Sequence, residues 1–283
     1  MYEKRMASAD PGLLVLLVDH SFSMSDPIVQ TGTNPMKKID AAAWGTNNFL
    51  YNVTQKCSGE AKYKDYLSIA VISYGDDVTS ALPKTPYENF PVSVNEIVDD
   101  YFKEIDDPQE VNGEPGSPLE WINTQQRLGG RTPMKLAFTK AEEIVKKWLP
   151  EHENSFPPII CNISDGIAND ISHDDEGFNS IISLCNEIQK LKTNDGNTII
   201  ANCHITDKEI RKLEYPCRNE VDTVDDYLAQ LLFEMSSDIP DAMRERAKKL
   251  EIETKDCSKF FVYGADLGSL VKLIKFGTDP TND

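Results

Sequence analysis

The sequence has no apolar run long enough to cross a bilayer, which needs about 20 residues. The run at 13–18 is short and ends at Asp19. No apolar segment of the signal-peptide type precedes Pro11. These absences predict a chain without a membrane span or a signal peptide, and the cytoplasm is the expected compartment.

Cysteines are few and are not arranged as ligands. The six cysteines form no CxxC pair and no cluster with zinc-ligand spacing. With 283 residues, 40% of them hydrophobic, the chain can build a core without covalent links, so a disulfide framework is not expected. Cys161 and Cys203 lie in apolar runs, where a buried thiol is the ordinary interpretation.

Positive charge is scarce. The sequence has 29 Lys and Arg against 47 Asp and Glu, which gives a formal net charge of −18. Such a surface repels nucleic-acid phosphates and anionic lipid headgroups, so no nucleic-acid partner and no membrane partner is expected. An acidic surface still attracts divalent cations.

Several catalytic motifs are also missing. The sequence has no GxSxG elbow, no GxxxxGK[ST] loop and no GxGxxG after its first apolar run. The four histidines are scattered, and His20 is expected to be exposed or packed and not to be a ligand. The sequence therefore gives no direct sign of an enzyme.

What is present is an alternation of short apolar runs and amphipathic segments. Strands are predicted at 13–18, 67–74, 159–163, 198–205 and 260–263. Most of these runs do not alternate with polar residues, so both faces of the strands should be covered, as in a parallel sheet. Helices are predicted at 36–53, 132–149, 178–191, 224–235, 242–250 and 267–276.

This alternation predicts the α/β class: a three-layer Rossmann-like sandwich with a mostly parallel central sheet and helices on both faces. The more polar segment 76–82 suits one antiparallel edge strand. We expect a single domain over 1–283, with a core of about 13–276. Insertions are expected at about 83–130 and 206–222, since neither has enough apolar residues for its own core.

Oxygen-bearing side chains follow two of the predicted strands and precede one helix. Asp19, Ser21 and Ser23 come directly after the first strand, Thr132 lies in LGGRTPMKLAF, and Asp165 lies in PPIICNISDG. In open α/β sheets, ligand sites lie outside the carboxyl ends of the strands. Hydroxyl and carboxylate oxygens are ligands that magnesium prefers.

Each of these segments also has an ordinary structural interpretation. The first is a turn rich in Ser and Asp. Thr132 can be a helix N-cap followed by Pro133 at the first helical position. Asp165 can belong to an Asp-Gly turn.

Taken together, the DxSxS segment, the threonine and the later aspartate resemble the metal-ion-dependent adhesion site of von Willebrand factor A domains, over about 13–276. The resemblance implies that Asp19, Ser21, Ser23, Thr132 and Asp165 hold Mg²⁺ or Mn²⁺. It also implies a protein-interaction function, in which a partner's Asp or Glu completes the metal's coordination. The family commonly has glycine between the two serines, where this chain has Phe22. Phe22, Met24 and Arg131 are a weaker prediction for the partner-binding rim.

Within that family, the early start of the domain and the GRTPM and ISDG turns look most like bacterial cytoplasmic proteins of the tellurite-resistance TerY type. Those proteins are typically encoded beside a protein kinase and a PP2C-type phosphatase, which makes either enzyme the implied partner. The resemblance also implies that the last helix, at 267–276, slides along the sheet on ligation.

Two alternatives stay open. One is a metal-dependent, phosphatase-like hydrolase, but the dehalogenase-type motif DxDx[TV] has a second acid where this chain has Ser21. Arg131 is the one nearby residue that could bind a phosphate. The other alternative is a module with a degenerate metal site, which Phe22 would permit.

Overall fold

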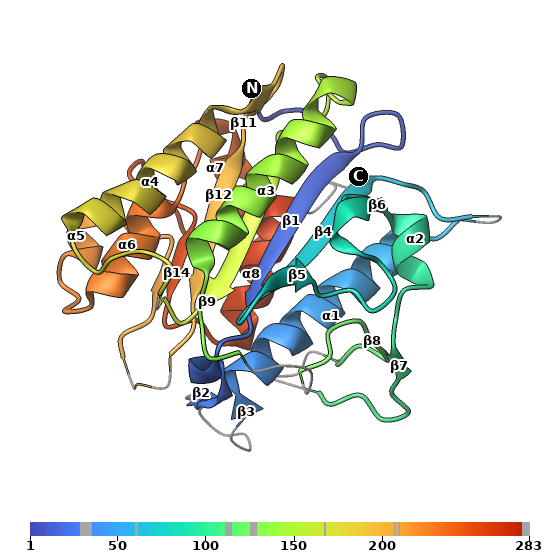
Figure 1. Ribbon diagram of the computed structural model, residues 1–283. Helices are drawn as coiled ribbons and strands as arrows, with labels where there is room; N and C mark the ends of the chain where they lie inside the picture. Colours follow the sequence, from blue (N-terminus) through green and yellow to red (C-terminus); the bar gives the residue numbers. More distant parts are fainter. Residues whose placement is uncertain are drawn as a thin grey trace.

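A mixed sheet of eight strands forms the centre of the molecule, with helices on both of its faces (Figure 1). The computed structural model describes residues 1–28, 36–59, 62–110, 115–124, 129–166, 168–206, 208 and 210–278. The strands of the main sheet are β1 (Gly12–Asp19), β4 (Leu67–Tyr74), β5 (Val78–Ser80), β6 (Val92–Ser93), β9 (Ile159–Ser164), β12 (Ile199–His204), β13 (Leu213–Glu214) and β14 (Phe261–Tyr263).

The strand order is β13-β14-β12-β9-β1-β4-β5, and β6 also pairs with β4. Strands β4, β1, β9, β12 and β14 are parallel. The antiparallel edge strand predicted at 76–82 is present as β5. Two further short strands, β6 and β13, are also antiparallel to their neighbours. The predicted fold class, a mostly parallel Rossmann-like sandwich, is confirmed.

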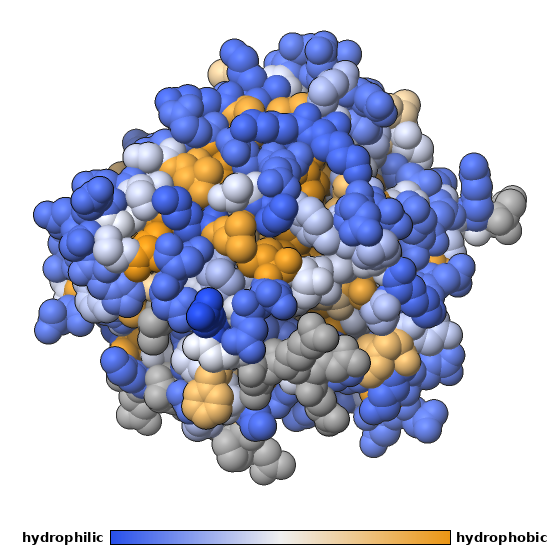
Figure 2. All heavy atoms as spheres, in the orientation of Figure 1, coloured by the Kyte–Doolittle hydropathy of each residue, from blue (hydrophilic) through white to orange (hydrophobic). Residues whose placement is uncertain are grey.

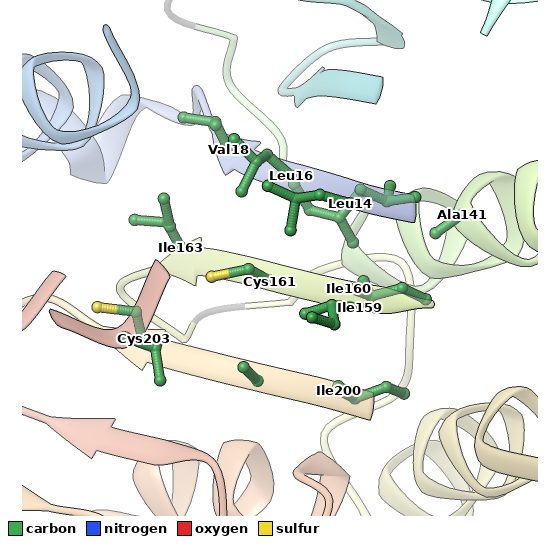
Figure 3. Packing of buried hydrophobic residues seen from close by; sticks show 14 of the residues in the cluster. Leu14, Leu16, Val18, Ala141, Ile159, Ile160, Cys161, Ile163, Ile200 and Cys203 are labelled. Atoms are coloured by element: carbon green, nitrogen blue, oxygen red, sulfur yellow. The ribbon is translucent and has the colours of Figure 1, made fainter. Parts of the chain in front are cut away.

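Strand β1 lies between β9 and β4 inside the sheet, and its whole sequence, GLLVLLVD, is buried there. Its register pairs Leu17 with Ile72 on one side and with Asn162 on the other. Figure 3 shows the apolar side chains of β1, β9 and β12 next to one another, with Ala141 of a covering helix beside them. Burial on both faces explains why these strands read as continuous apolar runs and do not alternate.

Two groups of helices cover the two faces of the sheet (Figure 1). Helices α1 and α8 pack against each other on one face, and α3, α4 and α6 form a contiguous layer on the other. The helices are α1 (Lys38–Cys57), α2 (Val94–Val98), α3 (Met134–Trp148), α4 (Asp175–Lys190), α5 (Arg218–Val221), α6 (Tyr227–Met235), α7 (Asp241–Lys249) and α8 (Leu267–Thr278). Each of the six predicted helices is present, with ends shifted by a few residues.

Shorter elements connect this framework. They are the 3-10 helices η1 (Phe22–Ser25), η2 (Tyr87–Asn89) and η3 (Leu149–Glu151) and the strand pairs β2 (Pro27–Ile28) with β3 (Met36–Lys37), β7 (Lys103–Glu104) with β8 (Leu119–Glu120), and β10 (Lys192–Thr193) with β11 (Gly196–Asn197). The described residues of 83–130 contain several of them: η2 contacts α3, β6 pairs with β4, and α2 and β8 pack against α1. There, Asn47 of α1 accepts hydrogen bonds from the backbone N–H groups of Trp121 and Ile122.

One disulfide was not predicted by the cysteine pattern. Cys217, next to α5, is bonded to Cys257, which precedes β14, and the two are 40 residues apart in sequence. The other four cysteines are free and buried, as expected for Cys161 and Cys203. No helix in the described part of the chain is long and apolar enough to cross a membrane.

Candidate metal centre

The candidate site lies where the strand order reverses. Within the main sheet, the next strand along the chain after β1 is β4, which lies on one side of β1. Strand β9 lies on the other side of β1, and from there the sheet continues in the opposite direction. At such a switch point the loops after neighbouring strands diverge and leave a crevice. Asp19 ends β1 and Asp165 directly follows β9, so the two buried carboxylates lie at the carboxyl ends of the two strands that meet at this switch point.

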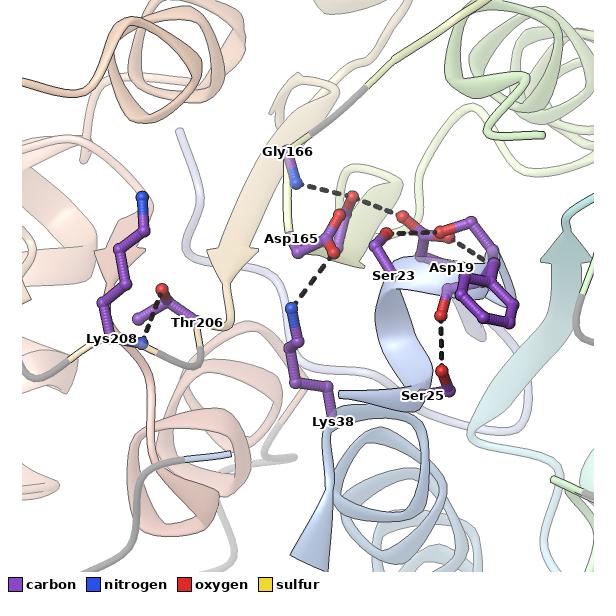
Figure 4. Close-up of polar contacts among 11 residues, drawn as sticks. Asp19, Ser23, Ser25, Lys38, Asp165, Gly166, Thr206 and Lys208 are labelled. Atoms are coloured by element: carbon purple, nitrogen blue, oxygen red, sulfur yellow. Dashed lines mark hydrogen bonds and ion pairs between the residues drawn. The ribbon is translucent and has the colours of Figure 1, made fainter. Parts of the chain in front are cut away.

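The loop after β1 gathers the first three predicted ligands. The backbone N–H of Ser21 donates to Asp19 Oδ1 at 2.8 Å, and the hydroxyl oxygens of Ser21 and Ser23 lie 3.0 Å apart. The chain then enters the 3-10 turn η1, whose last residue, Ser25, donates its hydroxyl hydrogen to the carbonyl of Phe22. Figure 4 shows Ser23 beside Asp19 at this tight turn.

The loop after β9 supports the same carboxylate. Ser164 donates its hydroxyl hydrogen to Asp19 Oδ2 at 2.7 Å, and its oxygen accepts a hydrogen bond from the N–H of Gly166. Gly166 has a φ of +92°, a backbone conformation that glycine adopts without strain, so the chain can turn sharply after Asp165. Both oxygens of Asp19 are therefore held in place by this chain's own donors.

Burial has a large effect on Asp19. The loss of hydration raises the pKa of its carboxyl to about 7, and the negative charge of Asp165 pushes it in the same direction. Hydrogen bonds from Ser164 and Ser21 oppose this rise. The site thus concentrates negative charge in a place where water does not stabilise it, and a bound cation would relieve that cost.

Asp165 uses one oxygen and leaves the other without a partner. Its Oδ2 lies 3.2 Å from the ammonium nitrogen of Lys38, and the two residues are only 6% and 3% exposed. Its Oδ1 is buried and has no hydrogen-bond partner among the described residues. A buried oxygen of this kind is costly unless something binds it. Figure 4 shows Asp165 between Lys38 and the loop that holds Asp19 and Ser23.

Thr132 lies in a third loop beside the first two. Gly129 forms a bridge with Ser21, and its N–H donates to the carbonyl of His20. On the other side, Thr132 and Asn169 exchange two hydrogen bonds, from Thr132 N–H to Asn169 Oδ1 and from Asn169 N–H to the Thr132 carbonyl. Thr132 is buried, and within the described residues no hydrogen bond joins its hydroxyl to the other four predicted ligands.

Thr132 does not act as the helix cap that local sequence signals suggest. Helix α3 begins at Met134, Pro133 occupies the cap position, and no side chain caps this end. Two backbone N–H groups of the first turn, those of Lys135 and Leu136, instead bond to the carboxylate of Asp170. The Thr132 hydroxyl is therefore not used for capping.

The predicted rim is only partly at the surface. Phe22 is 69% exposed and Arg131 is also exposed. Met24 is fully buried under the loop, so its inclusion in the partner-binding rim is wrong. Its apolar side chain anchors η1 to the core. A cavity of about 550 Å³ beside the Thr132 loop is lined by Arg131, Leu136 and Asp170, among others.

A chain of buried polar groups leads from the site across the sheet. Tyr74, the last residue of β4, donates to Asn162 Oδ1, and Asn162 donates to Asn202 Oδ1 on β12 at 3.0 Å. Asn202 in turn donates to Ser236, which follows α6. These partners bond to one another and leave little hydrogen-bonding capacity unused in the sheet's interior.

Several residues of this site were not predicted from the sequence. In the sequence, Lys38 looks like one of two surface lysines in PMKKID, and Ser164 looks like part of a turn. Asn169 lies in a polar loop with no distinguishing pattern. The one usable signal was Ser164, a hydroxyl at the carboxyl end of a buried strand next to a predicted ligand.

The donor set suits a hard divalent cation. Two carboxylates and three hydroxyls offer only oxygen, which matches magnesium or manganese. The buried, unpartnered Oδ1 of Asp165 is the observation that fits an absent cation. Among the residues that the structure describes, no group of three or more His, Cys, Asp or Glu side chains is arranged to hold a metal, so any metal here depends on the hydroxyls.

Comparisons with known proteins add little to this geometry. No family model matches the sequence, and no curated protein matches it. Among solved structures, the chain is similar to the three N-terminal domains of the type V pili tip protein Mfa5 from Porphyromonas gingivalis, with 15% identity, a TM-score of 0.30, and coverage of 56% of this chain and 20% of that one. It is also similar to the human COPII-coat protein Sec24c, with 8% identity, a TM-score of 0.33, and coverage of 69% and 26%.

This chain thus corresponds to only a fifth to a quarter of the length of those two proteins. At such identities and TM-scores the likeness says nothing about function.

Proposed function

We propose that this chain is a von Willebrand factor A-type interaction module, which binds Mg²⁺ or Mn²⁺ and through it the carboxylate of a protein partner. The observation that carries the proposal is the buried, unpartnered Asp165 Oδ1 in the same crevice as the carboxylate of Asp19. The strand order, with its reversal between β1 and β9, supports the assignment of the site to this edge.

Each residue has a distinct task in this proposal. Ser21 and Ser23 offer hydroxyl oxygens, and Ser23 lies at the partly exposed side of the loop. Asp19 is held by Ser164 and by the Ser21 N–H, which fix the orientation of its carboxylate. Asp165 offers Oδ1. Thr132 offers a hydroxyl from a loop that Gly129 and Asn169 keep in place.

The bound cation would supply an open coordination position for a carboxylate from outside. Three hydroxyls and two carboxylates offer five oxygen ligands, and magnesium favours six, so one coordination position stays open. Phe22 and Arg131, both exposed next to the loops, would contact the partner around this position. The cation would then provide affinity, and these side chains would provide specificity.

The partner proposed from the family resemblance is a protein, either a kinase or a PP2C-type phosphatase of a TerY-type bacterial stress system. A formal net charge of −18 supports a protein partner over a nucleic acid or an anionic membrane. The proposed compartment remains the cytoplasm, although the Cys217–Cys257 disulfide is a feature more common in oxidising compartments.

We propose a binding function and not catalysis. A hydrolase of the dehalogenase type needs a second carboxylic acid two residues after the first, and here Ser21 occupies that position and bonds to Ser23. Arg131 is exposed and lies on the outer side of the Thr132 loop, next to a cavity that also contains Asp76, Asp77 and Asp170. These acidic neighbours disfavour a phosphate there.

Calorimetric titration with Mg²⁺ and Mn²⁺ tests the proposal. The wild-type protein should release or absorb heat with a one-to-one end point, and Asp19→Ala should not. Asp77→Ala, which removes an exposed carboxylate outside the crevice, is the matched control and should bind like the wild type. Absence of metal binding by the folded wild-type protein would overturn the proposal, and turnover of a phosphorylated substrate would support the hydrolase.

A further inference from the structure

A cavity of about 530 Å³ lies between the β4–β5 edge of the main sheet and the segment that carries β7 and β8 (Figure 1). Residues of β4 and β5 line one part of it, and Phe102 and Trp121, which lie next to β7 and β8, line another. His20, which directly follows Asp19, also lines it, so the cavity adjoins the first loop of the candidate metal centre. A volume of this size is typical of ligand sites.

The pair of strands β7 and β8 supplies an aromatic wall. The N–H of Phe102 donates to the carbonyl of Glu120 at 2.9 Å, and the N–H of Trp121 donates to Asn47 Oδ1 of α1 at 2.9 Å. Trp121 is fully buried, and its indole N–H donates to the carbonyl of Ile97 at 2.8 Å. Phe102 is 37% exposed. Hydrogen bonds thus fix both residues, with one ring deep in the structure and the other at its surface.

The strands β4 and β5 and the turn between them supply polar groups. Ser73 of β4 lines the cavity and is only 8% exposed, and its hydroxyl forms no hydrogen bond with any residue that the structure describes. Most buried hydroxyls in proteins are hydrogen-bonded, so this group points to a ligand. Asp76 lies at the surface, and its Oδ1 accepts a hydrogen bond of 2.8 Å from the N–H of Gly130, which fixes its carboxylate. The cavity therefore offers a buried hydroxyl and an oriented carboxylate.

The charge and the apolar surface of this cavity fit one kind of ligand. The acidic side chains among its described lining residues are aspartates, including Asp76, and none of these lining residues is a lysine or an arginine. Across the described residues, no group of three or more His, Cys, Asp or Glu side chains could hold a metal ion, so a bare cation does not fit here. An arginine does fit, because its guanidinium group bonds to carboxylates and stacks on aromatic rings while its methylene groups pack on apolar surface.

We propose that this cavity is a second binding site, which takes the arginine side chain of a protein partner. The inference goes beyond the proposed function, because arginine binding here needs no metal ion. The guanidinium group would bond to Asp76 and to the Ser73 hydroxyl, and the methylene groups would pack against Phe102 and Trp121. Since Asp76 and Phe102 are exposed, an arginine carried by a polypeptide reaches the cavity from solvent. A partner would present this arginine next to the loop that begins at Asp19.

Titration of the metal-free protein with N-acetyl-arginine methylamide, followed by nuclear magnetic resonance of the tryptophan indole N–H groups, tests the inference. This probe has no carboxylate, so it is not a ligand for the proposed cation. The Trp121 signal should shift with a dissociation constant on the order of 1 mM. The signal of Trp148, whose indole N–H bonds to Ser68 at the other end of β4, should stay in place. The neutral analogue N-acetyl-citrulline methylamide should bind about fivefold more weakly or worse, because it lacks the charge.

Two variants and a matched control locate the binding. Asp76→Asn removes the charge but keeps an oxygen for the Gly130 N–H, and it should weaken arginine binding about tenfold. Ser73→Ala removes the buried hydroxyl and should weaken it about threefold. Asp106→Asn changes an exposed carboxylate of the same 83–130 segment that does not line the cavity, and it should bind like the wild type. The Trp121 signal without ligand shows whether the cavity wall of each variant is intact.

The outcomes separate this inference from the proposed function. No shift of the Trp121 signal in the folded wild type, or equal binding of the arginine and citrulline probes, would overturn the inference and leave the metal site intact. Equal arginine binding by Asp76→Asn and Asp106→Asn would overturn it as well. Tighter binding of free L-arginine than of the blocked probe would overturn the assignment to a protein partner. Arginine binding by a protein that binds neither Mg²⁺ nor Mn²⁺ would support the cavity site and overturn the proposed function alone.

Discussion

Tyr74 on β4 donates a hydrogen bond of 2.7 Å to Asn162 on β9, although β1 lies between these two strands. Both residues are fully buried, and both lie near the carboxyl ends of their strands. The bond links the two strands that flank β1, just below the loop that begins at Asp19.

Removing this bond should cost stability. Tyr74→Phe keeps the ring but leaves Asn162 Oδ1 buried without its donor, so we expect a loss of about 1–3 kcal/mol in the free energy of unfolding. Urea denaturation followed by circular dichroism measures it. Tyr227→Phe, at a largely exposed tyrosine, is the control and should change the free energy little. Equal stability of the two variants would show that the Tyr74 bond has no net effect.

The Thr132 loop depends on close backbone contact at one glycine. A Cβ on Gly129 would lie 2.1 Å from the backbone nitrogen of Asp76, whereas a Cβ on Gly130 would meet nothing closer than 3.8 Å. Gly129→Ala should therefore destabilise the protein by more than about 2 kcal/mol, because the loop must move away from the backbone of Asp76, and the shift should disturb the bridge to Ser21 and weaken the proposed Mn²⁺ binding. Gly130→Ala should change neither property appreciably, and a similar effect of both changes would contradict this account.

A group of charged residues ties the start of α8 to the edge of the sheet. Ser269 Oγ lies 2.6 Å from Glu214 Oε1 and 2.8 Å from Asp266 Oδ1, so the two carboxylates share its single hydroxyl hydrogen, and Lys212 lies 3.0 Å from Glu214 and 3.1 Å from Asp266. Partial burial acts to raise the pKa of Glu214, but the hydrogen bonds from Ser269 and Lys212 outweigh it and lower the pKa below its usual value. The pKa of Asp266 is lowered in the same way.

Acid should therefore weaken this attachment. A carboxyl whose pKa is lower in the folded state contributes stability above its unfolded pKa, near 4, and this contribution disappears as the pH falls through the folded pKa. We expect Glu214→Gln to reduce the fall in unfolding free energy between about pH 5 and pH 3. The exposed Glu151→Gln is the control. A wild-type pH profile in Glu214→Gln would show that this group does not contribute.

The disulfide gives a fourth prediction. Thiol titration of the unfolded, unreduced protein should detect four of the six cysteines, because Cys217 and Cys257 are bonded. Cys217→Ser should lower the free energy of unfolding by about 2–4 kcal/mol, as expected for a link that closes a loop of this size. Reductant should lower the stability of the wild type by a similar amount and leave that of Cys217→Ser unchanged. Six reactive thiols in the unreduced protein would contradict the bond.

Much of the fold follows from pattern alone. The buried strands β1, β4 and β9 are short apolar runs with no polar alternation, and α3 and α4 repeat their apolar residues at helical spacing. These patterns are local, so they can be read from single segments. The pairings of β6 and β13 could not be predicted, because strands of two residues have no periodicity.

The candidate site was predictable only in part. Asp19, Ser21 and Ser23 follow a buried strand in one short loop, so their proximity is a local property. The burial of Lys38 depends on contact between the start of α1 and the loop after β9, 127 residues away in sequence. Nothing in the residue type distinguishes it from Lys37. The prediction that Met24 belongs to the partner-binding rim was wrong for a similar reason. Whether the side chain of a loop residue points inward is decided by the packing beneath the loop.

The surface of the molecule also includes the two edges of the main sheet, where the strands are short. Figure 2 shows a face that is mostly hydrophilic, with hydrophobic residues near its centre. At the two margins of the sheet the outermost strands are β5, with three residues, and β13, with two. Strands this short give a neighbouring chain few free N–H and C=O groups to align with, so growth of the sheet from one molecule into the next is discouraged.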